Sequence, residues 1–522
     1  MLDMPWSFPM YDVMVLSALA LGAVVLYRRR STKSRGTDIP GPKREDWLWG
    51  YSRVLLTAKR WDYISTWQKE YGSVLRIPTV LTGSSTMFLD VKAIHYIVST
   101  HSDNFQRPEA GRKMLKRMLG GGILTSEGED HKRFRRTMSP GFSAASIRYF
   151  TSLFLDIAQK AKNHWLDQMD LEGKEEVTIN VEPWLSDMSF DSMGEAGFSH
   201  SFNAVDGSKP LVAQLFDSFG GARLLLFRRM LFVFLRDAAI FRWLPIAGLL
   251  TDRTREAMTE IARNVMHDEG ALQDAKEGRR SLVASILKEE DRKLSESEVV
   301  AQMNTLILAA YLTTSHALTW CFHELSSHPT VQTKLRAELQ RFPNPTALQI
   351  ENEMPYLDVI VKECLRLHPT IPVVRRVAMA DAFIPLSAPI LTRDGQIVPS
   401  IHLPAGAELT IPIEPMNRST LIWGADAEDF RPERWLAPLP EGAQEVGGWN
   451  HTLTFLDGPR NCIGRNFAVA EIKAILVTFF RDLSIQPWKD GTDVKPELAF
   501  FVRARNEGVK GLILRVRKLD VE

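Results

Sequence analysis

The hydrophobic pattern of the chain begins with one long apolar stretch. Residues 13–27 carry no charged side chain, and basic residues follow immediately, starting at Arg28. As a helix, residues 5–27 would span about 34 Å, enough to cross the ~30 Å hydrocarbon core of a bilayer. A cleaved secretory signal would instead carry its positive charge before the apolar run. Since basic flanks stay cytoplasmic, we expect a lumenal N-terminus at 1–12, a transmembrane anchor at 13–27 and a basic, proline-rich linker at 28–44.

The pattern beyond the linker predicts a mainly α-helical protein with small β-sheets. Residues 73–77 and 86–90 flank a turn-rich segment and predict a β-hairpin. Helical periodicity dominates from about residue 91, and strand-like segments return near 371–413. Because no second linker interrupts this pattern, we expect residues 45–522 to form one catalytic domain.

Two helical segments stand out within that domain. The longest predicted helix covers 296–327, where Ser295 and Glu298 form a capping box and His328-Pro329 ends the helix. Residues 224–250 are very apolar but interleaved with arginines, which favours helices lying on a membrane surface. Ordinary core helices are the alternative for 224–250.

Composition narrows the function classes. The chain has 522 residues, of which 45% are hydrophobic and 24% charged, with a formal net charge of +1. This balance gives no signal for nucleic-acid binding. The three cysteines, Cys321, Cys364 and Cys462, are too few for a disulfide framework, which is typical of a reducing compartment.

Cys462 lies in a glycine-rich loop just before a predicted helix. The helix N-terminus would favour its thiolate form, and the glycines would let the backbone approach a flat cofactor. Arg460 could pair with an anionic group on that cofactor. From these residues alone, three roles stay open for Cys462: metal ligand, nucleophile with His451 as its base, or structural residue.

The segment Phe455-Leu-Asp-Gly-Pro-Arg-Asn-Cys-Ile-Gly464 resembles the haem-ligand signature of the cytochrome P-450 family. All the fixed positions are present: Phe455, Gly458, Arg460, Cys462 and Gly464. The resemblance implies the P-450 fold, an α-helical prism, with haem b (iron protoporphyrin IX) bound to Cys462. The other four residues of the signature would contact the cofactor.

Further motifs follow in the family's order. Glu363 and Arg366 match its ExxR motif, and Arg434 lies in a PERF-like motif in which Trp435 replaces the usual phenylalanine. The resemblance implies that Glu363, Arg366 and Arg434 form a buried structural network. Two sequons, at Asn417 and Asn450, should carry no glycan if the domain is cytoplasmic.

The haem propionates require cationic partners. His131 and Arg135, four residues apart on one predicted helical face, match the family's propionate-binding pair, and Arg376 resembles another partner, with Arg375 as its rival. The neighbouring basic residues fit a docking patch for an acidic flavoprotein, the NADPH–cytochrome reductase: Lys132, Arg133 and Arg136.

The oxygen-activating helix departs from the family pattern. Thr313 is retained as the catalytic hydroxyl, but Ala310 replaces the usual glycine and Leu312 replaces the usual acid. Cleavage of the O–O bond requires protons, so this departure concerns the mechanism. Three routes stay open: a water chain through Thr313, an acid from elsewhere, or chemistry that depends less on this relay.

Taken together, the resemblance implies a haem-thiolate monooxygenase that inserts one oxygen atom from O2 into an apolar substrate. We expect a fungal secondary metabolite such as a terpenoid, with electrons delivered from NADPH through the reductase. Residues 103–125 and 201–250 are expected to line the substrate pocket. The expected location is the endoplasmic reticulum membrane, single-pass, with the catalytic domain in the cytoplasm. Two alternatives are a haem-thiolate isomerase or dehydratase, which Leu312 keeps open, and a non-enzymatic haem- or steroid-binding membrane protein.

Overall fold

The computed structural model describes most of the chain from residue 36 onward. The described residues are 36–52, 54, 60–80, 83–208, 214, 255–264, 281–283, 294–489, 494–498 and 501–519. The predicted anchor at 13–27 and the predicted surface helices at 224–250 lie outside these ranges. Within the described part of the chain, no helix combines the length and the hydropathy needed to cross a bilayer.

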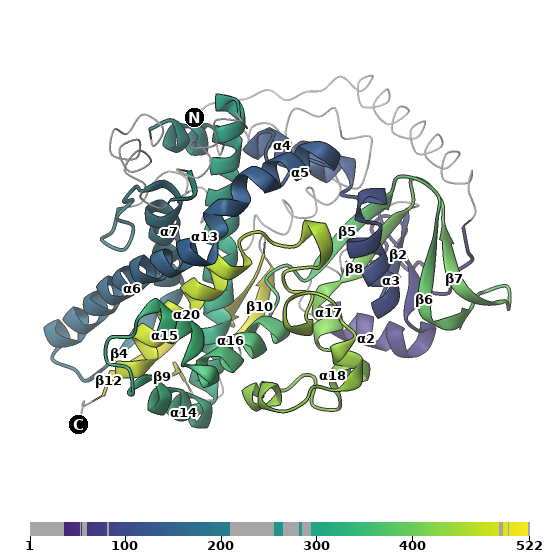
Figure 1. Ribbon diagram of the computed structural model, residues 1–522. Coiled ribbons are helices and arrows are strands. Elements are labelled where there is room, and N and C mark those ends of the chain that lie inside the picture. The colour runs from purple at the N-terminus through teal and green to yellow at the C-terminus, as the bar shows by residue number, and fades with distance from the viewer. Residues whose placement is uncertain are drawn as a thin grey trace, which may run out of the picture.

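Helices dominate the described residues, and four small sheets accompany them (Figure 1). The α-helices are α2 (Arg60–Tyr71), α3 (Val91–His95), α4 (Glu109–Leu119), α5 (Gly128–Met138), α6 (Ala144–Glu172), α7 (Val181–Phe198), α13 (Glu296–Ser327), α14 (Pro329–Leu339), α15 (Ala347–Asn352), α16 (Pro355–Leu367), α17 (Ile413–Asn417), α18 (Thr420–Trp423), α19 (Glu441–Gln444) and α20 (Arg465–Asp482). The strands are β1 (Val74–Pro78), β2 (Ser84–Phe88), β3 (Phe105–Gln106), β4 (Glu176–Asn180), β5 (Val373–Ala378), β6 (Ala382–Leu391), β7 (Ile397–Leu403), β8 (Glu408–Pro412), β9 (Leu483–Pro487), β10 (Val494–Leu498), β11 (Val502–Asn506) and β12 (Ile513–Lys518).

The longest helix, α13, runs through the middle of the molecule (Figure 1). Its start is held by the predicted capping box, in which the Ser295 hydroxyl accepts from the Glu298 N–H and the Glu298 carboxylate accepts from the Ser295 N–H. Residues 301–308 and 314–322 are buried without interruption, as expected for a helix surrounded by other elements. The predicted helix at 296–327 is therefore confirmed.

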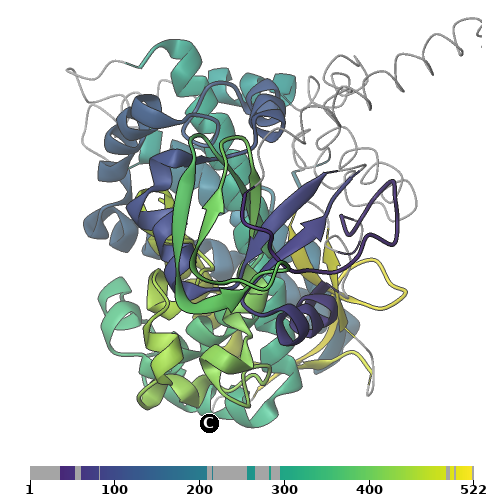
Figure 2. The same cartoon turned by 90° about the vertical axis from the view of Figure 1, so that its right-hand side faces the viewer.

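The β-rich side of the molecule brings together segments that are distant in sequence. The largest sheet has the strand order β1-β2-β8-β5-β3, in which β8 joins β2 in parallel and the remaining pairs are antiparallel. Figure 2 views this side, with the β6–β7 hairpin in front of the first strands. The structure confirms both the predicted early hairpin, with Val74 opposite Phe88, and the strands predicted near 371–413.

Helix α20 fixes the position of the Cys462 loop. It packs against α6, α13, α14 and α16, and its residues 471–480 are all buried. Because α20 begins at Arg465, three residues after Cys462, this packing holds the loop beside the central helix α13. The mainly α fold with small sheets thus places the predicted sulfur ligand beside the central helix α13.

Candidate haem-binding site

The loop that carries Cys462 is held by its own backbone and by close packing. The Cys462 N–H donates to the Phe455 carbonyl oxygen at 2.9 Å, which closes the loop, and the Phe455 ring packs edge-on against Trp449. Gly458 has a φ of +69°, and a Cβ atom there would lie 2.4 Å from the Val98 carbonyl oxygen. Only glycine meets both conditions, so Gly458 acts by letting two segments of the protein approach each other.

The surroundings of Cys462 act on its thiol in two directions. The side chain is accessible to solvent, yet protein encloses it closely enough that burial raises the pKa of the thiol. The backbone N–H of Gly464 and the nearby guanidinium groups of Arg135 and Arg465 lower this pKa. These are the groups that would stabilise a thiolate at the start of a helix.

Arg135 lies against the Cys462 loop. Its Nη1 donates to the Asn461 carbonyl oxygen at 2.7 Å, and its Nη2 donates to the Asn461 side chain. Burial lowers the pKa of Arg135, and the neighbouring Cys462 opposes that shift. Arg135 therefore connects helix α5 to the residue next to the sulfur.

The other predicted cationic partners gather in a separate cluster. Burial, followed by the charges of Arg107 and Arg460, lowers the pKa of Arg376 to about 10. The pKa of His131 falls to about 4 for the same reasons, so its imidazole is neutral at pH 7 and offers hydrogen bonding rather than charge. Glu127 forms an ion pair with Arg460, and its carboxylate accepts a hydrogen bond from the backbone N–H of Arg107 at 3.3 Å.

This cluster fits the anionic edge of a haem. Arg107, Arg376 and Arg460 supply three guanidinium groups, and their mutual repulsion is offset in the cluster by the single carboxylate of Glu127. A group with two carboxylates would complete the charge balance with bidentate hydrogen bonds. Together with the accessible sulfur of Cys462, this donor set is what iron protoporphyrin IX requires.

The structure distinguishes between the two neighbouring arginines of β5. Arg375 forms an ion pair with Glu408, whereas Arg376 is buried and donates to the Arg375 carbonyl oxygen at 2.9 Å. Since successive residues of a strand point to opposite faces, only one of them can face the cluster. The geometry favours Arg376 over its rival Arg375.

Arg107 was not among the predicted site residues. It follows strand β3, whose pairing with β5 places Phe105 opposite Ala378 and Gln106 opposite Val377, and so brings Arg107 near Arg376. It lies within residues 103–125, which are expected from the sequence to line the substrate pocket. Its proximity to Arg376 depends on this strand pairing.

The middle of α13 is partly exposed between two buried stretches of the helix. Ala309 is exposed, and Ala310, Leu312 and Thr313 are partly exposed, between the two long buried stretches. The Thr313 hydroxyl donates to the Ala309 carbonyl oxygen at 2.5 Å. Ala310 and Leu312 pack against the same hydrophobic cluster as Ile463, the residue after Cys462. The predicted oxygen-activating turn and the cysteine loop thus belong to one region.

The predicted structural network is joined by several hydrogen bonds. Glu363 accepts from Nε and Nη2 of Arg366 at 2.8 Å each and from Nε of Arg434 at 2.8 Å. All three side chains are buried. Trp435, which replaces the family's phenylalanine, donates its indole N–H to Glu363 at 3.0 Å. These hydrogen bonds compensate the negative charge of Glu363, which would otherwise be costly to bury.

Two further expectations concern residues around this site. His451 directs Nδ1 to the Val446 carbonyl oxygen at 3.3 Å, and within the described residues no hydrogen bond joins it to Cys462. On the surface of α5, Lys132 pairs with Glu129 and Asp103, and Arg133 pairs with Asp130 and Glu298. The candidate docking patch is therefore less basic than its sequence indicates.

Comparison with known proteins agrees with this geometry. The family model described as Cytochrome P450 matches residues 40–508. The chain is 38% identical to cytochrome P450 monooxygenase claP of Ampulloclitocybe clavipes, over 98% of both proteins. It is 39% identical to cytochrome P450 monooxygenase claO of the same fungus, over 95% of this chain and 96% of the relative. Cytochrome P450 monooxygenase 128 of Postia placenta is 31% identical over 98% and 96%, respectively.

Proposed function

The chain belongs to the cytochrome P450 family and is a monooxygenase, and from this premise we propose that Cys462 would supply the thiolate ligand of haem b in an enzyme that oxidises an apolar metabolite. When bound, the haem supplies the oxygen-activating chemistry, which the electron density of a thiolate ligand favours. The observation that carries this assignment is the accessible Cys462 sulfur at the start of α20, facing the N–H of Gly464 and the charge of Arg135.

The remaining residues would bind and orient the cofactor. Arg107, Arg376 and Arg460 would hold the propionates, and the neutral His131 would add a hydrogen bond. Arg135 would keep the Cys462 loop in place through Asn461. On α13, the Thr313 hydroxyl can donate or accept a proton at Oγ1.

We further propose an apolar substrate, such as a fungal terpenoid, and electron delivery from NADPH through a membrane-bound reductase flavoprotein. The accessible apolar side chains of Ala309, Ala310 and Leu312 support an apolar substrate. The uncharged run at 13–27 followed by basic residues supports a single-pass anchor in the endoplasmic reticulum membrane, with the catalytic domain in the cytoplasm.

The assignment of Cys462 can be tested by absorption spectroscopy of the purified, haem-loaded protein. Wild-type protein should show a thiolate-type Soret band that shifts toward high spin when one class of apolar metabolite is titrated, terpenoids first. Cys462→Ser should lose the thiolate band, whereas Cys321→Ala, at a buried cysteine in α13, should keep it. A thiolate band in Cys462→Ser would contradict the assignment. A wild-type band that no compound shifts would contradict the proposed substrate class.

A further inference from the structure

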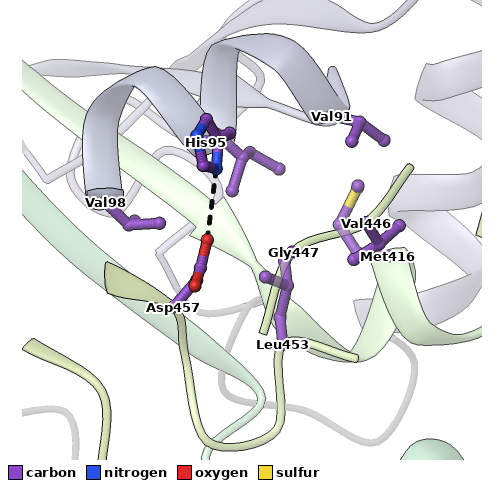
Figure 3. Close-up of a pocket in the computed structure, with 9 residues that line it drawn as sticks. Val91, His95, Val98, Met416, Val446, Gly447, Leu453 and Asp457 are labelled. Atoms are coloured by element: carbon purple, nitrogen blue, oxygen red, sulfur yellow. Dashed lines mark hydrogen bonds and ion pairs between the residues drawn. The ribbon is translucent and has the colours of Figure 1, made fainter. Parts of the chain in front are cut away.

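A hydrogen bond joins the Cys462 loop to a helix more than 300 residues away in sequence. Nδ1 of His95, at the end of α3, lies 3.2 Å from Oδ2 of Asp457, which precedes Gly458 in the loop (Figure 3). The side chains are 55% and 20% exposed, respectively.

Glycine at position 447 leaves the space that the His95–Asp457 contact requires. A Cβ atom on Gly447 would lie 2.4 Å from Oδ2 of Asp457 and 3.6 Å from Nδ1 of His95, so a larger residue at 447 would displace the carboxylate. The pair sits at the edge of a small apolar pocket whose lining includes Val91, Ile94, Val98, Met416 and Leu453 (Figure 3).

The loop itself is held in a conformation that it would not adopt alone. Leu456 has a φ of +57°, which is rare for a bulky side chain and persists only where the surroundings impose it. Gly458 packs directly on Val98 and Ser99, in the π-helical turn formed by Tyr96–Thr100 just after His95. His95 and this turn are therefore part of the surroundings that hold the loop.

Helix α3 is firmly placed at its other end. The Asp90 carboxylate caps it by accepting from the Ala93 N–H at 2.9 Å. The same carboxylate accepts from the Ser387 N–H of β6 at 3.0 Å. His95 thus connects a helix anchored on the β6–β7 hairpin to the loop of the sulfur ligand.

We propose that His95 is a positioning residue for the Cys462 loop: by donating to Asp457 it holds residues 455–462 in the conformation that presents the sulfur to the haem iron. The inference rests on the proposed role of Cys462 as the axial ligand. Without this hydrogen bond, the loop can relax around Leu456, and the sulfur loses its fixed approach to the iron. The consequence is a less durable bond between the thiolate and the haem iron.

The test measures how long full-length, haem-loaded protein keeps its thiolate ligand. The readout is the rate at which the thiolate-type Soret band of the ferrous carbon monoxide complex is lost at constant temperature. We expect His95→Leu to lose it about three to ten times faster than wild type, the effect of one partly exposed hydrogen bond. His95→Asn retains an N–H near the position of Nδ1 and should restore a rate close to wild type.

The chain offers a matched control in a second exposed pair. His164 and Asp206 lie 3.3 Å apart with side-chain exposures of 40% and 39%, far from the Cys462 loop in sequence. His164→Leu should leave the rate unchanged. The double variant His95→Leu/Asp457→Ala should be no faster than Asp457→Ala alone, because both changes remove the same interaction.

The outcomes separate this inference from the proposed function. If wild-type protein shows no thiolate band at all, the assignment of Cys462 fails. If the wild-type band is present, any of three results overturns the role of His95: an unchanged rate in His95→Leu, an equal acceleration in His164→Leu, or no rescue by His95→Asn.

Discussion

At the scale of single residues, Trp435 shows how a substitution within a family motif can add an interaction. Its indole N–H donates to Glu363, a carboxylate that is also held by Arg366 and Arg434. A phenylalanine at this position would fill similar space but would remove one donor from a fully buried charge.

We expect Trp435→Phe to lower the free energy of unfolding by about 1–3 kcal/mol, since hydrogen bonds to charged groups are worth roughly that amount. Denaturant unfolding of the haem-loaded protein measures it. Trp47→Phe, at a side chain that is 74% exposed, is the matched control and should change little. Equal stabilities of Trp435→Phe and wild type would show that the indole N–H contributes nothing.

Proton delivery also belongs to the residue scale. With Leu312 in the position of the usual acid, the nearest acids on α13 are Glu298 and Glu324, roughly 20 Å along the helix at 1.5 Å per residue. Glu298 is paired with Arg133, and Glu324 is hydrogen-bonded to His368 at 2.6 Å. No acid of α13 therefore lies near this turn, and Thr313 supplies a partly exposed hydroxyl there that can donate or accept a proton.

Thr313→Ala should divert electrons from product to hydrogen peroxide or water. We expect the yield of product per NADPH consumed to fall at least about tenfold, because positioned proton-transfer groups contribute roughly 10²- to 10⁴-fold. Thr333→Ala is the matched control, since Thr333 also donates to the carbonyl oxygen four residues earlier, but at an exposed position on α14. An unchanged yield would place proton delivery elsewhere.

At the scale of elements, helix α20, which follows the Cys462 loop, carries the buried carboxyl group of Glu471. Burial raises the pKa of Glu471 to about 8, and the nearby hydroxyls of Ser189 and Ser192 on α7 only moderate the shift. None of these hydroxyl and carboxyl oxygens meets the geometry of a hydrogen bond. The packing of α20 against the core therefore favours a protonated Glu471.

The consequence is a pH-dependent stability. Between the ordinary pKa of 4.5 and about 8, folded Glu471 holds a proton that the unfolded chain has released. The free energy of unfolding therefore decreases as pH rises through this window, by at most roughly 1.4 kcal/mol per pH unit.

Glu471→Gln removes this titration. Its stability advantage over wild type should be larger at pH 7.5 than at pH 5.5, as measured by denaturant unfolding at both values. Glu296→Gln, at an exposed position on α13, should show no such trend. A constant difference between Glu471→Gln and wild type would mean that Glu471 is not the titrating group.

At the scale of the whole molecule, the structure changes what the two sequons can report about topology. Asn417 is buried, its Nδ2 donates to Thr454 Oγ1 at 2.9 Å, and its Oδ1 accepts from the Leu453 N–H at 3.0 Å. It could not carry a glycan in the folded protein on either side of a membrane. Only Asn450, which is partly exposed, is informative.

If the catalytic domain is cytoplasmic, Asn450 stays unmodified when the full chain is expressed in a eukaryotic cell. The full chain should stay with the membranes after alkaline extraction, whereas a chain lacking residues 1–35 should be released at least in part. Glycosidase treatment should not change the electrophoretic mobility of either form. A shift that Asn450→Gln abolishes would reverse the proposed orientation.

Local patterns in the sequence determined much of the fold and the centre of the site. The capping box at Ser295, the early β-hairpin and the cysteine-containing signature each lie within a few tens of residues. Their geometry follows from caps, turns and helical spacing, which act over short distances. For the same reason, the sequence alone places Glu363 and Arg366 together, because i,i+3 spacing puts them on one helical face.

Outside the family's own motifs, tertiary structure decided which distant residues meet. The grouping of Arg107 with Arg376 depends on pairing between β3 and β5, and the contact of Arg135 with Asn461 depends on where α5 meets the loop before α20. The His95–Asp457 bond joins residues 362 positions apart. Sequence identifies the charges available for such contacts, but their partners are set by non-local packing, which no short-range periodicity encodes.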